Sequence, residues 1–240
     1  MSDAIRVGLV GFGYASKTFH APLIGGTPGM ALKAVASSDA DKVHADWPGV
    51  KVMSAPGDLL DDPDIDLVVI ATPNDTHFPL AKAALEAGKH VVVDKPFTVT
   101  LSQARELESL AKHCGRILSV FHNRRWDSDF LTVSALINEG QLGEVCYFES
   151  HFDRFRPQVR QRWREQAGPG SGIWYDLAPH LLDQVVVLFG LPVSITVDLA
   201  QLRPGAQSTD YFHAVLAYPQ RRVVLHGTLL AAAESARFIV

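Results

Sequence analysis

The sequence predicts an α/β protein with two domains. Residues 1–122 are expected to form a doubly wound parallel sheet, and residues 123–240 an α+β domain with a largely antiparallel sheet. Short β-branched runs alternate with helical stretches through the first half, as in successive βαβ units. The second half instead ends in three long strands with few helical signals between them. A length of 240 residues is compatible with two domains.

The first half contains six short apolar runs that are typical of buried parallel strands. They lie at residues 5–10, 30–37, 51–53, 66–71, 90–94 and 116–121. Helices are expected between them, to about residue 24 and at residues 39–46, 77–87 and 101–114. Thr100 and Gln103 form a capping box that begins the last helix, and Gly115 ends it.

The second half is expected to begin with a helix at residues 128–139 and a strand at residues 144–152. An arginine-rich stretch, a glycine-rich loop and a helix at about residues 177–189 follow. The three long strands are expected at residues 193–202, 211–218 and 223–230. The chain stops inside an apparent strand, 236–240, and such an apolar edge suggests a truncation or a covering partner.

Composition limits the partners. With 22 basic and 26 acidic residues the net charge is −4, which argues against nucleic acid as the main partner. Cys114 and Cys146 are far apart, so we expect two buried packing cysteines and no metal site. No apolar run approaches the ~18 residues of a membrane span. The N-terminus does not resemble a signal peptide, and we expect a cytoplasmic protein without a membrane partner.

A glycine-rich loop follows the first strand. Gly11-Phe12-Gly13-Tyr14-Ala15-Ser16 stands where a helix is expected to begin, which is the position of the Rossmann dinucleotide fingerprint. Gly11 permits a tight turn, and Gly13 lets a pyrophosphate approach the backbone at the helix start. Ser16 replaces the usual third glycine or alanine with another small residue. The alternative is an ordinary strand-to-helix turn.

The end of the second strand bears on the choice of dinucleotide. An acidic residue there would bind the ribose 2′-hydroxyl of NAD. Here Ser37 and Ser38 occupy this place, and Lys42 could approach a 2′-phosphate, so the sequence favours NADP over NAD. Asp39 keeps NAD open because it could reach the ribose itself. The other role of Asp39 would be to cap the next helix.

Asp94-Lys95-Pro96 follows the buried strand at residues 90–94. Ligands of open α/β sheets bind outside the carboxyl ends of the strands, where the ring of Pro96 would fix the cation of Lys95. The alternative is a surface lysine in a turn.

Asp176 and His180 are four residues apart at the expected start of a helix. A carboxylate beside an imidazole orients the ring for proton transfer near neutral pH, whereas the helix N-terminus would keep the ring neutral. The alternative is that Asp176 only caps the helix and His180 is a core residue. Pro179 counts against it, because as the third helical residue it would offer no N–H to the cap.

Taken together, these motifs resemble the Gfo/Idh/MocA oxidoreductases. The order of the glycine loop, Thr72-Pro73-Asn74 with His77, Asp94-Lys95-Pro96 and Asp176-x-x-x-His180 carries the resemblance, which covers essentially the whole chain. His122-Asn123-Arg124-Arg125-Trp126-Asp127 and Trp174 to His180 are most similar to the NADP-dependent scyllo-inositol dehydrogenase subgroup. Two features depart from the family: Asp94 replaces the more common Glu, and members continue past residue 240.

The resemblance implies a dehydrogenase that acts on a polyol or sugar with NADP, or with NAD. Lys95 would hydrogen-bond the reacting hydroxyl, often after a cis bond to Pro96, and His180 would remove its proton while Asp176 orients either partner. Arg125 and Tyr175 are further substrate-side candidates. The implied cofactor-binding residues are Gly11, Phe12, Gly13, Tyr14, Ser16, Ser37, Ser38, Lys42, Thr72, Pro73, Asn74, His77, Asp94, Lys95, Pro96, Asn123, Trp163 and Arg164.

This interpretation requires Lys95 and His180 to reach the same alcohol carbon. The family resemblance also implies a homo-oligomer, a dimer or a tetramer. Two other functions remain open on the sequence: a non-catalytic nicotinamide-binding sensor, and a glycosidase of the same family that uses the dinucleotide transiently. For Asn74 and His77, and for the arginines between residues 154 and 164, structural or solvated surface roles remain alternatives.

Overall fold

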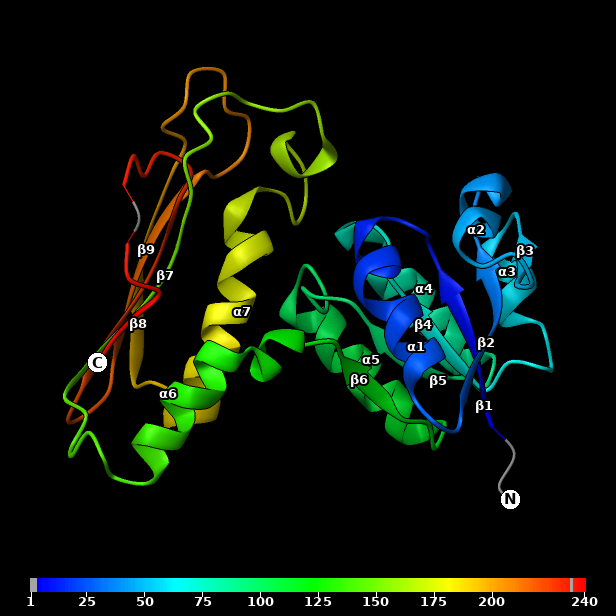
Figure 1. Cartoon of the computed structure of the whole chain (residues 1–240), viewed down its shortest axis with the longest axis horizontal. Coiled ribbons are helices and arrows are strands. Elements are labelled where there is room, and N and C mark those ends of the chain that lie inside the picture. Colours follow the sequence, from blue (N-terminus) through cyan, green and yellow to red (C-terminus); the bar gives the residue numbers. More distant parts are fainter. Residues whose placement is uncertain (1–3, 234) are drawn as a thin grey trace. The chain divides into compact units, whose positions relative to one another are not determined.

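The computed structural model describes residues 4–233 and 235–240. The chain divides into two compact units, Met1–Phe121 and His122–Val240 (Figure 1). Among the described residues, no helix combines the length and the apolar composition needed to cross a bilayer.

The N-terminal unit is built on a six-stranded sheet in which all neighbouring strands are parallel. The strand order is β3-β2-β1-β4-β5-β6, so the direction of winding reverses between β1 and β4. This topology confirms the predicted doubly wound sheet. The strands are β1 (Ile5–Val10), β2 (Met30–Ala36), β3 (Lys51–Met53), β4 (Leu67–Ile70), β5 (His90–Val93) and β6 (Leu118–Val120).

Alternate residues of the strands enter two cores, one on each face of this sheet. Val10 and Ile70 lie in a core that they form with buried residues of α3 (Pro56–Leu60), α4 (His77–Glu86) and α5 (Leu101–His113). Leu9 and Val69 point the other way, into the core of α1 (Ala21–Gly26) and α2 (Ala40–Asp46). The capping box of Thr100 and Gln103 is confirmed at the start of α5. The short helix α3 was not predicted.

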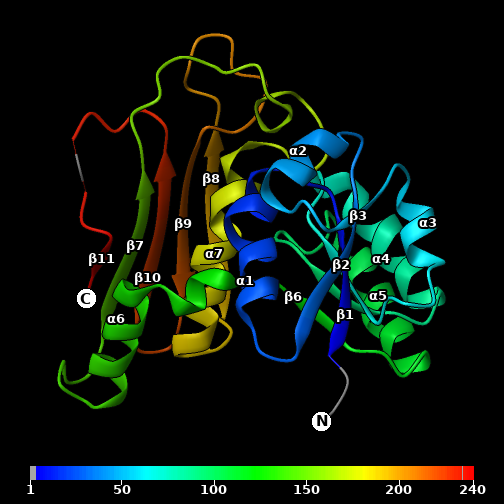
Figure 2. The same ribbon diagram turned by 45° about the vertical axis from the view of Figure 1, so that its right-hand side comes forward.

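The C-terminal unit contains a five-stranded sheet in the order β11-β7-β10-β9-β8 (Figure 2). Three of its four pairings are antiparallel, and only β7 and β10 run parallel. The prediction of a largely antiparallel sheet is therefore confirmed, with one parallel pair that makes it mixed. The elements are α6 (Ser128–Asn138), β7 (Tyr147–Asp153), α7 (Gly172–Phe189), β8 (Ser194–Ala200), β9 (Tyr211–Ala217), β10 (Arg222–Thr228) and β11 (Phe238–Ile239).

One face of this sheet packs on α7. Phe148, Phe212, Leu216 and Leu225 from three strands form a buried core with Leu181 of the helix. Because side chains alternate along a strand, the intervening residues lie on the opposite, open face. At the end of the chain, β11 pairs with β7 through Phe238 and Ile239.

Helix α7 begins earlier than the sequence predicted, at Gly172 instead of Leu177. Ile173 and Leu177 are both buried in the core, so the helical apolar pattern extends one turn further towards the N-terminus. Pro179 is therefore inside the helix, and the interpretation of Pro179 as its third residue was wrong.

The cysteine prediction was also partly wrong. Cys146 is exposed just before β7, and Cys114 is only half-buried at the end of α5.

Candidate active-site residues in the two units

The glycine loop connects β1 to the first helical turns. Gly11 has a φ of +89°, donates its N–H to the Ala36 carbonyl at 2.9 Å, and would place an added Cβ 2.7 Å from the Ala71 carbonyl oxygen. Only glycine fits this position. Ser16 is fully buried, and its hydroxyl donates to the Gly11 carbonyl at 2.8 Å. The departure at the third fingerprint position thus gives the loop an additional hydrogen bond.

Gly13 differs from Gly11 because the packing of the chain does not require a glycine there. A Cβ built on Gly13 would meet no atom of the protein within 4 Å, so the space in front of its backbone is open. The helical turns begin directly after it, which directs N–H groups to this space. These features fit a dinucleotide pyrophosphate. Phe12 is buried in the core of α1 and α2, whereas Tyr14 is exposed.

Alanine at these two glycines is expected to have opposite effects. Gly11→Ala forces a side chain into the left-handed region and against a carbonyl, so the free energy of unfolding falls by at least about 1–2 kcal/mol. Gly13→Ala changes it by less than about 0.5 kcal/mol but weakens dinucleotide binding. Urea unfolding and titration with NADPH measure the two quantities. Wild-type affinity in Gly13→Ala would show that no pyrophosphate approaches this backbone.

The end of β2 shows how Asp39 is used. Its carboxylate accepts a hydrogen bond from the Lys42 N–H at 2.9 Å and caps α2, which is the structural alternative considered for it. Ser37 is half-buried and bonds with the backbone of Asp39 at 3.2 Å. The side chains of Ser38 and Lys42 are exposed. Among these residues of the strand end, the one acidic side chain, Asp39, is therefore already used as a helix cap.

His77 connects the turns that follow β4 and β5. The imidazole is fully buried, with Nδ1 2.8 Å from the Pro96 carbonyl oxygen and Nε2 3.0 Å from the Thr72 carbonyl oxygen. Both ring nitrogens therefore contact the backbone, so His77 positions these turns and does not present its ring to a cleft. Asn74 is buried and Pro73 exposed in the same turn. The Lys95–Pro96 peptide is cis, as the resemblance implied.

Asp94 has a buried neighbour that the sequence did not reveal. Its carboxylate accepts from the Lys95 N–H at 2.7 Å and lies 3.6 Å from His20 Nε2. His20 in turn packs its ring on Phe121, with centroids 4.2 Å apart. Burial raises the pKa of Asp94, but the His20 imidazole at 3.6 Å and the Lys95 N–H and ammonium outweigh it, so the net pKa lies below the usual range. The shorter Asp side chain thus remains an anion beside Lys95.

The N-terminal unit gathers its predicted residues at one edge of the sheet. Gly11 approaches Ala71 and Thr72, and Thr72 is joined to Pro96 through His77. These contacts place the loops after β1, β4 and β5 side by side at the carboxyl ends of their strands, where ligands of such sheets bind.

The C-terminal unit holds the second group of residues on α7. Asp176 and His180 are the fifth and ninth residues of the helix, one turn apart, so neither lies at its N-terminus and Asp176 does not cap it. The predicted influence of a helix start on His180 was therefore wrong. His180 is 6% exposed, and its ring lies nearly perpendicular to that of Phe152, at an interplanar angle of 83° with centroids 6.4 Å apart.

Arg164 joins this group from the preceding loop. Its Nε lies 3.4 Å from Asp176 Oδ1, and its guanidinium stacks on Trp163 with 4.4 Å between the charge centre and the ring. The structure thus brings together Trp163 and Arg164, which were predicted as cofactor residues, and Asp176, which was predicted as a catalytic and substrate residue. Tyr175 is half-buried beside them on α7.

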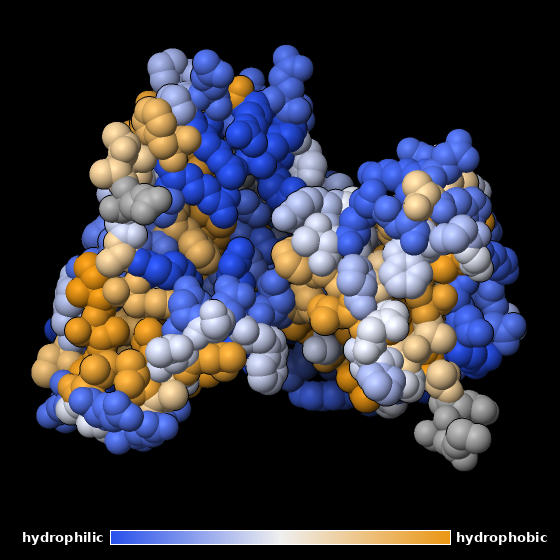
Figure 3. Space-filling model, in the orientation of Figure 1, coloured by the Kyte–Doolittle hydropathy of each residue, from blue (hydrophilic) through white to orange (hydrophobic). Residues whose placement is uncertain are grey.

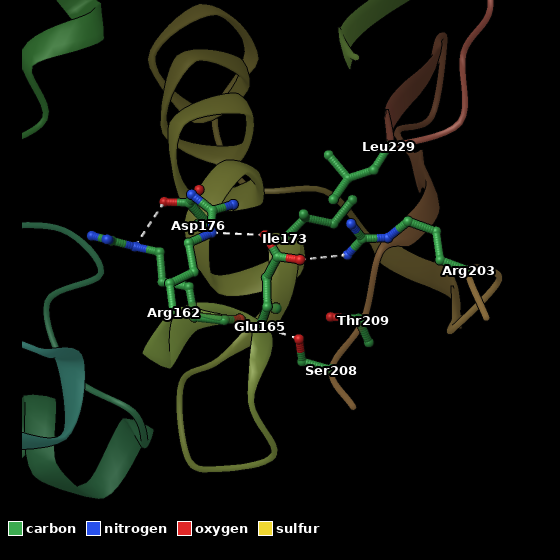
Figure 4. Close-up of a pocket in the computed structure, with 10 residues that line it drawn as sticks. Arg162, Glu165, Ile173, Asp176, Arg203, Ser208, Thr209 and Leu229 are labelled. Carbon is green, nitrogen blue, oxygen red and sulfur yellow. Dashed lines mark hydrogen bonds and ion pairs between the residues drawn. The ribbon is translucent and has the colours of Figure 1, made fainter. Parts of the chain in front are cut away.

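A buried ionic network fixes the loop that carries Trp163 and Arg164. Glu165 accepts from Arg203 at 3.0 Å and from Arg162 at 2.7 Å (Figure 4). Asp210 also accepts from Arg203, at 2.9 Å. Arg203 and Asp210 side chains are 2% and 1% exposed. Burial raises the pKa of Glu165, but the Arg160 N–H, Arg162 and Arg203 outweigh it and lower the net pKa. The sequence did not indicate this network, because Arg203 lies 38 residues from Glu165 in the chain.

Arg125 and Asn123 lie in the 3₁₀ turn Asn123–Trp126. Arg125 makes a bidentate ion pair with Asp183, with N–O distances of 2.7 and 2.6 Å, which raises the pKa of the guanidinium. Arg125 is therefore engaged with Asp183, a partner that the sequence did not indicate. The turn is attached to α7 by a bond from the Gln184 amide to the Arg124 carbonyl at 2.8 Å.

Comparison with known proteins identifies both units. The model of the oxidoreductase family with an NAD-binding Rossmann fold matches residues 5–122, and the model of its C-terminal α/β domain matches residues 134–240. The chain belongs to the Gfo/Idh/MocA oxidoreductase family. Lys95 of this family member belongs to the N-terminal unit, and Asp176 and His180 belong to the C-terminal unit.

Three relatives show how this Gfo/Idh/MocA chain compares. It is 80% identical over 240 residues to the uncharacterized oxidoreductase YdgJ of Escherichia coli, covering 100% of this chain and 69% of that protein. It is 37% identical to scyllo-inositol 2-dehydrogenase (NADP(+)) IolW of Bacillus subtilis, covering 98% and 66%. The solved structure of YPO2259 from Yersinia pestis is 70% identical, with a TM-score of 0.94 and coverage of 100% and 68%.

Proposed function

We propose that this chain is an NAD(P)-dependent dehydrogenase that transfers hydride between a secondary alcohol of a polyol or sugar and the nicotinamide. The observation that carries the proposal is the glycine loop: a fixed turn at Gly11 and open backbone at Gly13 before a helix start. An inositol-like substrate is supported by the 37% identity to the scyllo-inositol dehydrogenase of Bacillus subtilis.

The dinucleotide is proposed to lie along the carboxyl edge of the N-terminal sheet. The backbone of Gly11, Phe12 and Gly13, with Tyr14 and Ser16 at the helix start, would hold its pyrophosphate. Ser37, Ser38 and Lys42 would surround the adenosine ribose. Thr72, Pro73, Asn74, Asp94 and Pro96 would line the cleft towards the nicotinamide, with Asn123, Trp163 and Arg164 from the C-terminal unit.

The reaction needs a cation, a base and an orienting group. In the proposal the Lys95 ammonium donates a hydrogen bond to the reacting hydroxyl, and the neutral His180 imidazole accepts its proton. Asp176 orients the substrate in the proposal. The Asp176 carboxylate is itself held by Arg164, whose Nε lies 3.4 Å from Oδ1. Tyr175 and Arg125 are proposed at the substrate side. The bound dinucleotide supplies the hydride acceptor, and the protein supplies positioning and charge.

The preference for NADP gives a thermal prediction. NADP(H) is expected to raise the melting temperature more than equimolar NAD(H), because tighter binding to the native state stabilises it more. The capping of α2 by Asp39 supports the preference for NADP, because the carboxylate that could bind the ribose of NAD accepts the Lys42 N–H instead. Lys42→Glu should reverse the order by repelling a 2′-phosphate, with Lys33→Glu, an exposed lysine earlier on β2, as the control. A larger shift with NAD(H) in the wild type would contradict it.

The direct test is a panel of inositols, other polyols and sugars, followed by nicotinamide absorbance. Reduction of the dinucleotide with a cyclic polyol is expected. Release of sugar from a glycoside without a net absorbance change would indicate a glycosidase, and dinucleotide binding without turnover of any substrate would indicate a sensor.

The chain is also proposed to form a dimer or tetramer in the cytoplasm. Apolar side chains gather on the lower left of the view in Figure 3, on the C-terminal unit. Its large exposed apolar residues include Leu191, Val193, Ile195 and Leu199. Exposed apolar side chains favour association when they form a contiguous patch. Light scattering on the purified chain measures the assembly.

A further inference from the structure

The open face of the C-terminal sheet carries a row of polar side chains across four strands. The pairing register places His151 of β7 beside His226 of β10, His226 beside His213 of β9, and His213 beside Asp198 of β8. Their neighbours in sequence, such as Phe212 and Leu225, point into the core under α7. The row therefore lies on the face opposite the helix that carries Asp176 and His180.

Asp153 lies between two of these imidazoles. Its Oδ1 is 2.7 Å from His226 Nδ1, and its Oδ2 is 3.3 Å from His151 Nδ1. One donor atom from each of the three residues lies within 4.8 Å of the other two. The side chains of Asp153, His226 and His151 are only 8%, 19% and 16% exposed, so water screens the charges of this cluster little.

A second carboxylate controls the orientation of His151. Glu149 Oε2 lies 2.6 Å from His151 Nε2, on the opposite edge of the ring from Asp153. In the neutral imidazole, an Nε2–H that donates to Glu149 leaves the lone pair of Nδ1 directed at Asp153. Two lone pairs that face each other at 3.3 Å repel unless a cation lies between them. Carboxylate, imidazole and metal follow one another in this way in protein metal sites.

We propose that His151, Asp153 and His226 form a binding site for a divalent transition metal, with Zn²⁺ as the best match. Two imidazole nitrogens and one carboxylate oxygen form a common zinc donor set, completed by water. Zinc bonds of about 2.0–2.1 Å place tetrahedral donors about 3.3 Å apart. The distance from Asp153 Oδ2 to His151 Nδ1 is 3.3 Å, which matches this value. The distance from Asp153 Oδ1 to His226 Nδ1 is 2.7 Å, and a rotation of the His226 ring would lengthen it to the same value.

The site has a structural role in this proposal. It would join the neighbouring strands β7 and β10, and Asp153 also accepts a hydrogen bond from Ser235 in the segment before β11. A metal ion would thus join two strands directly and would fix the segment before β11 through Asp153. The sequence did not indicate the site, because His226 lies far along the chain from His151 and Asp153.

Metal-free protein, prepared with a chelator, tests the proposal by titration with Co²⁺ and Zn²⁺. We expect one ion per chain, visible absorption bands with Co²⁺, and a higher melting temperature with Zn²⁺. His226→Gln and His151→Gln should each weaken binding at least about tenfold, and Glu149→Gln about 10- to 100-fold as an orienting residue. His113→Gln, an exposed histidine at the end of α5, is the control and should bind as the wild type.

Circular dichroism of each variant shows whether it is folded, so the comparison uses the folded variants. If the wild type binds no stoichiometric Co²⁺ or Zn²⁺, a proton holds His151 and Asp153 together and the proposal is wrong. Unchanged affinity in a folded His226→Gln or His151→Gln variant would overturn it equally. Neither result depends on the proposed dehydrogenase activity.

Discussion

Replacing His180 or Lys95 by alanine is expected to lower kcat by about 10²-fold or more while dinucleotide affinity stays nearly unchanged. The proposal gives each residue a role at the reacting hydroxyl, His180 as proton acceptor and Lys95 as hydrogen-bond donor. Removing either group therefore raises the barrier of the chemical step by about 2.7 kcal/mol without touching the glycine loop. Steady-state kinetics and a fluorescence titration with NADPH separate the two quantities.

Matched controls are available in the same chain. His113→Ala removes an exposed imidazole and Lys33→Ala an exposed ammonium, and both should leave kcat unchanged. The double variant Lys95→Ala/His180→Ala tests whether the two groups serve one step. Residues that act as a unit are strongly non-additive, so the double variant should be little slower than either single variant. Wild-type turnover in both single variants would contradict the assignment.

Arg203→Ala is expected to lower the free energy of unfolding of the C-terminal unit by about 3–5 kcal/mol. The guanidinium is almost fully buried between Glu165 and Asp210, and it also donates to the carbonyls of Arg156 and Gln158 at 3.1 Å. Its removal leaves two buried carboxylates without their shared cation. Urea unfolding followed by tryptophan fluorescence measures the loss, because three of the four tryptophans lie in this unit.

In the proposed function Trp163 and Arg164 contact the dinucleotide. Because the Arg203 network holds their loop, the same variant is expected to weaken dinucleotide binding. Arg160→Ala, whose side chain is exposed in this loop, is the control and should change stability by less than about 0.5 kcal/mol. A loss below about 1 kcal/mol in Arg203→Ala would mean that the network contributes little to stability.

The sequence predicted those parts of the molecule that depend on local pattern. The run at residues 91–93 is apolar and β-branched, and it lies in β5 as expected. Gly11 and the capping box of Thr100 and Gln103 act through neighbouring backbone, so their roles could be inferred directly. Helix α3 has only five residues and starts with Pro56-Gly57, which is too short for a periodic signal.

The remaining features depend on topology. His20 meets Asp94, and Arg203 meets Glu165, only because the fold brings distant segments together. Helix α7 begins at Gly172 because Ile173 is buried against the sheet, which local propensity does not reveal. The ion pair of Arg125 with Asp183 depends on topology in the same way, because 58 residues separate the two in the chain.

The parallel pairing of β7 with β10 has a consequence for folding order. Tyr147 faces Arg222, and the chain between them contains α7, β8 and β9. This long segment must be closed before β7 and β10 can form their backbone hydrogen bonds, whereas β9 and β10 are joined by a short hairpin turn. Non-local contacts of this kind slow folding, so β7 is expected to dock after the β8–β9–β10 meander has formed.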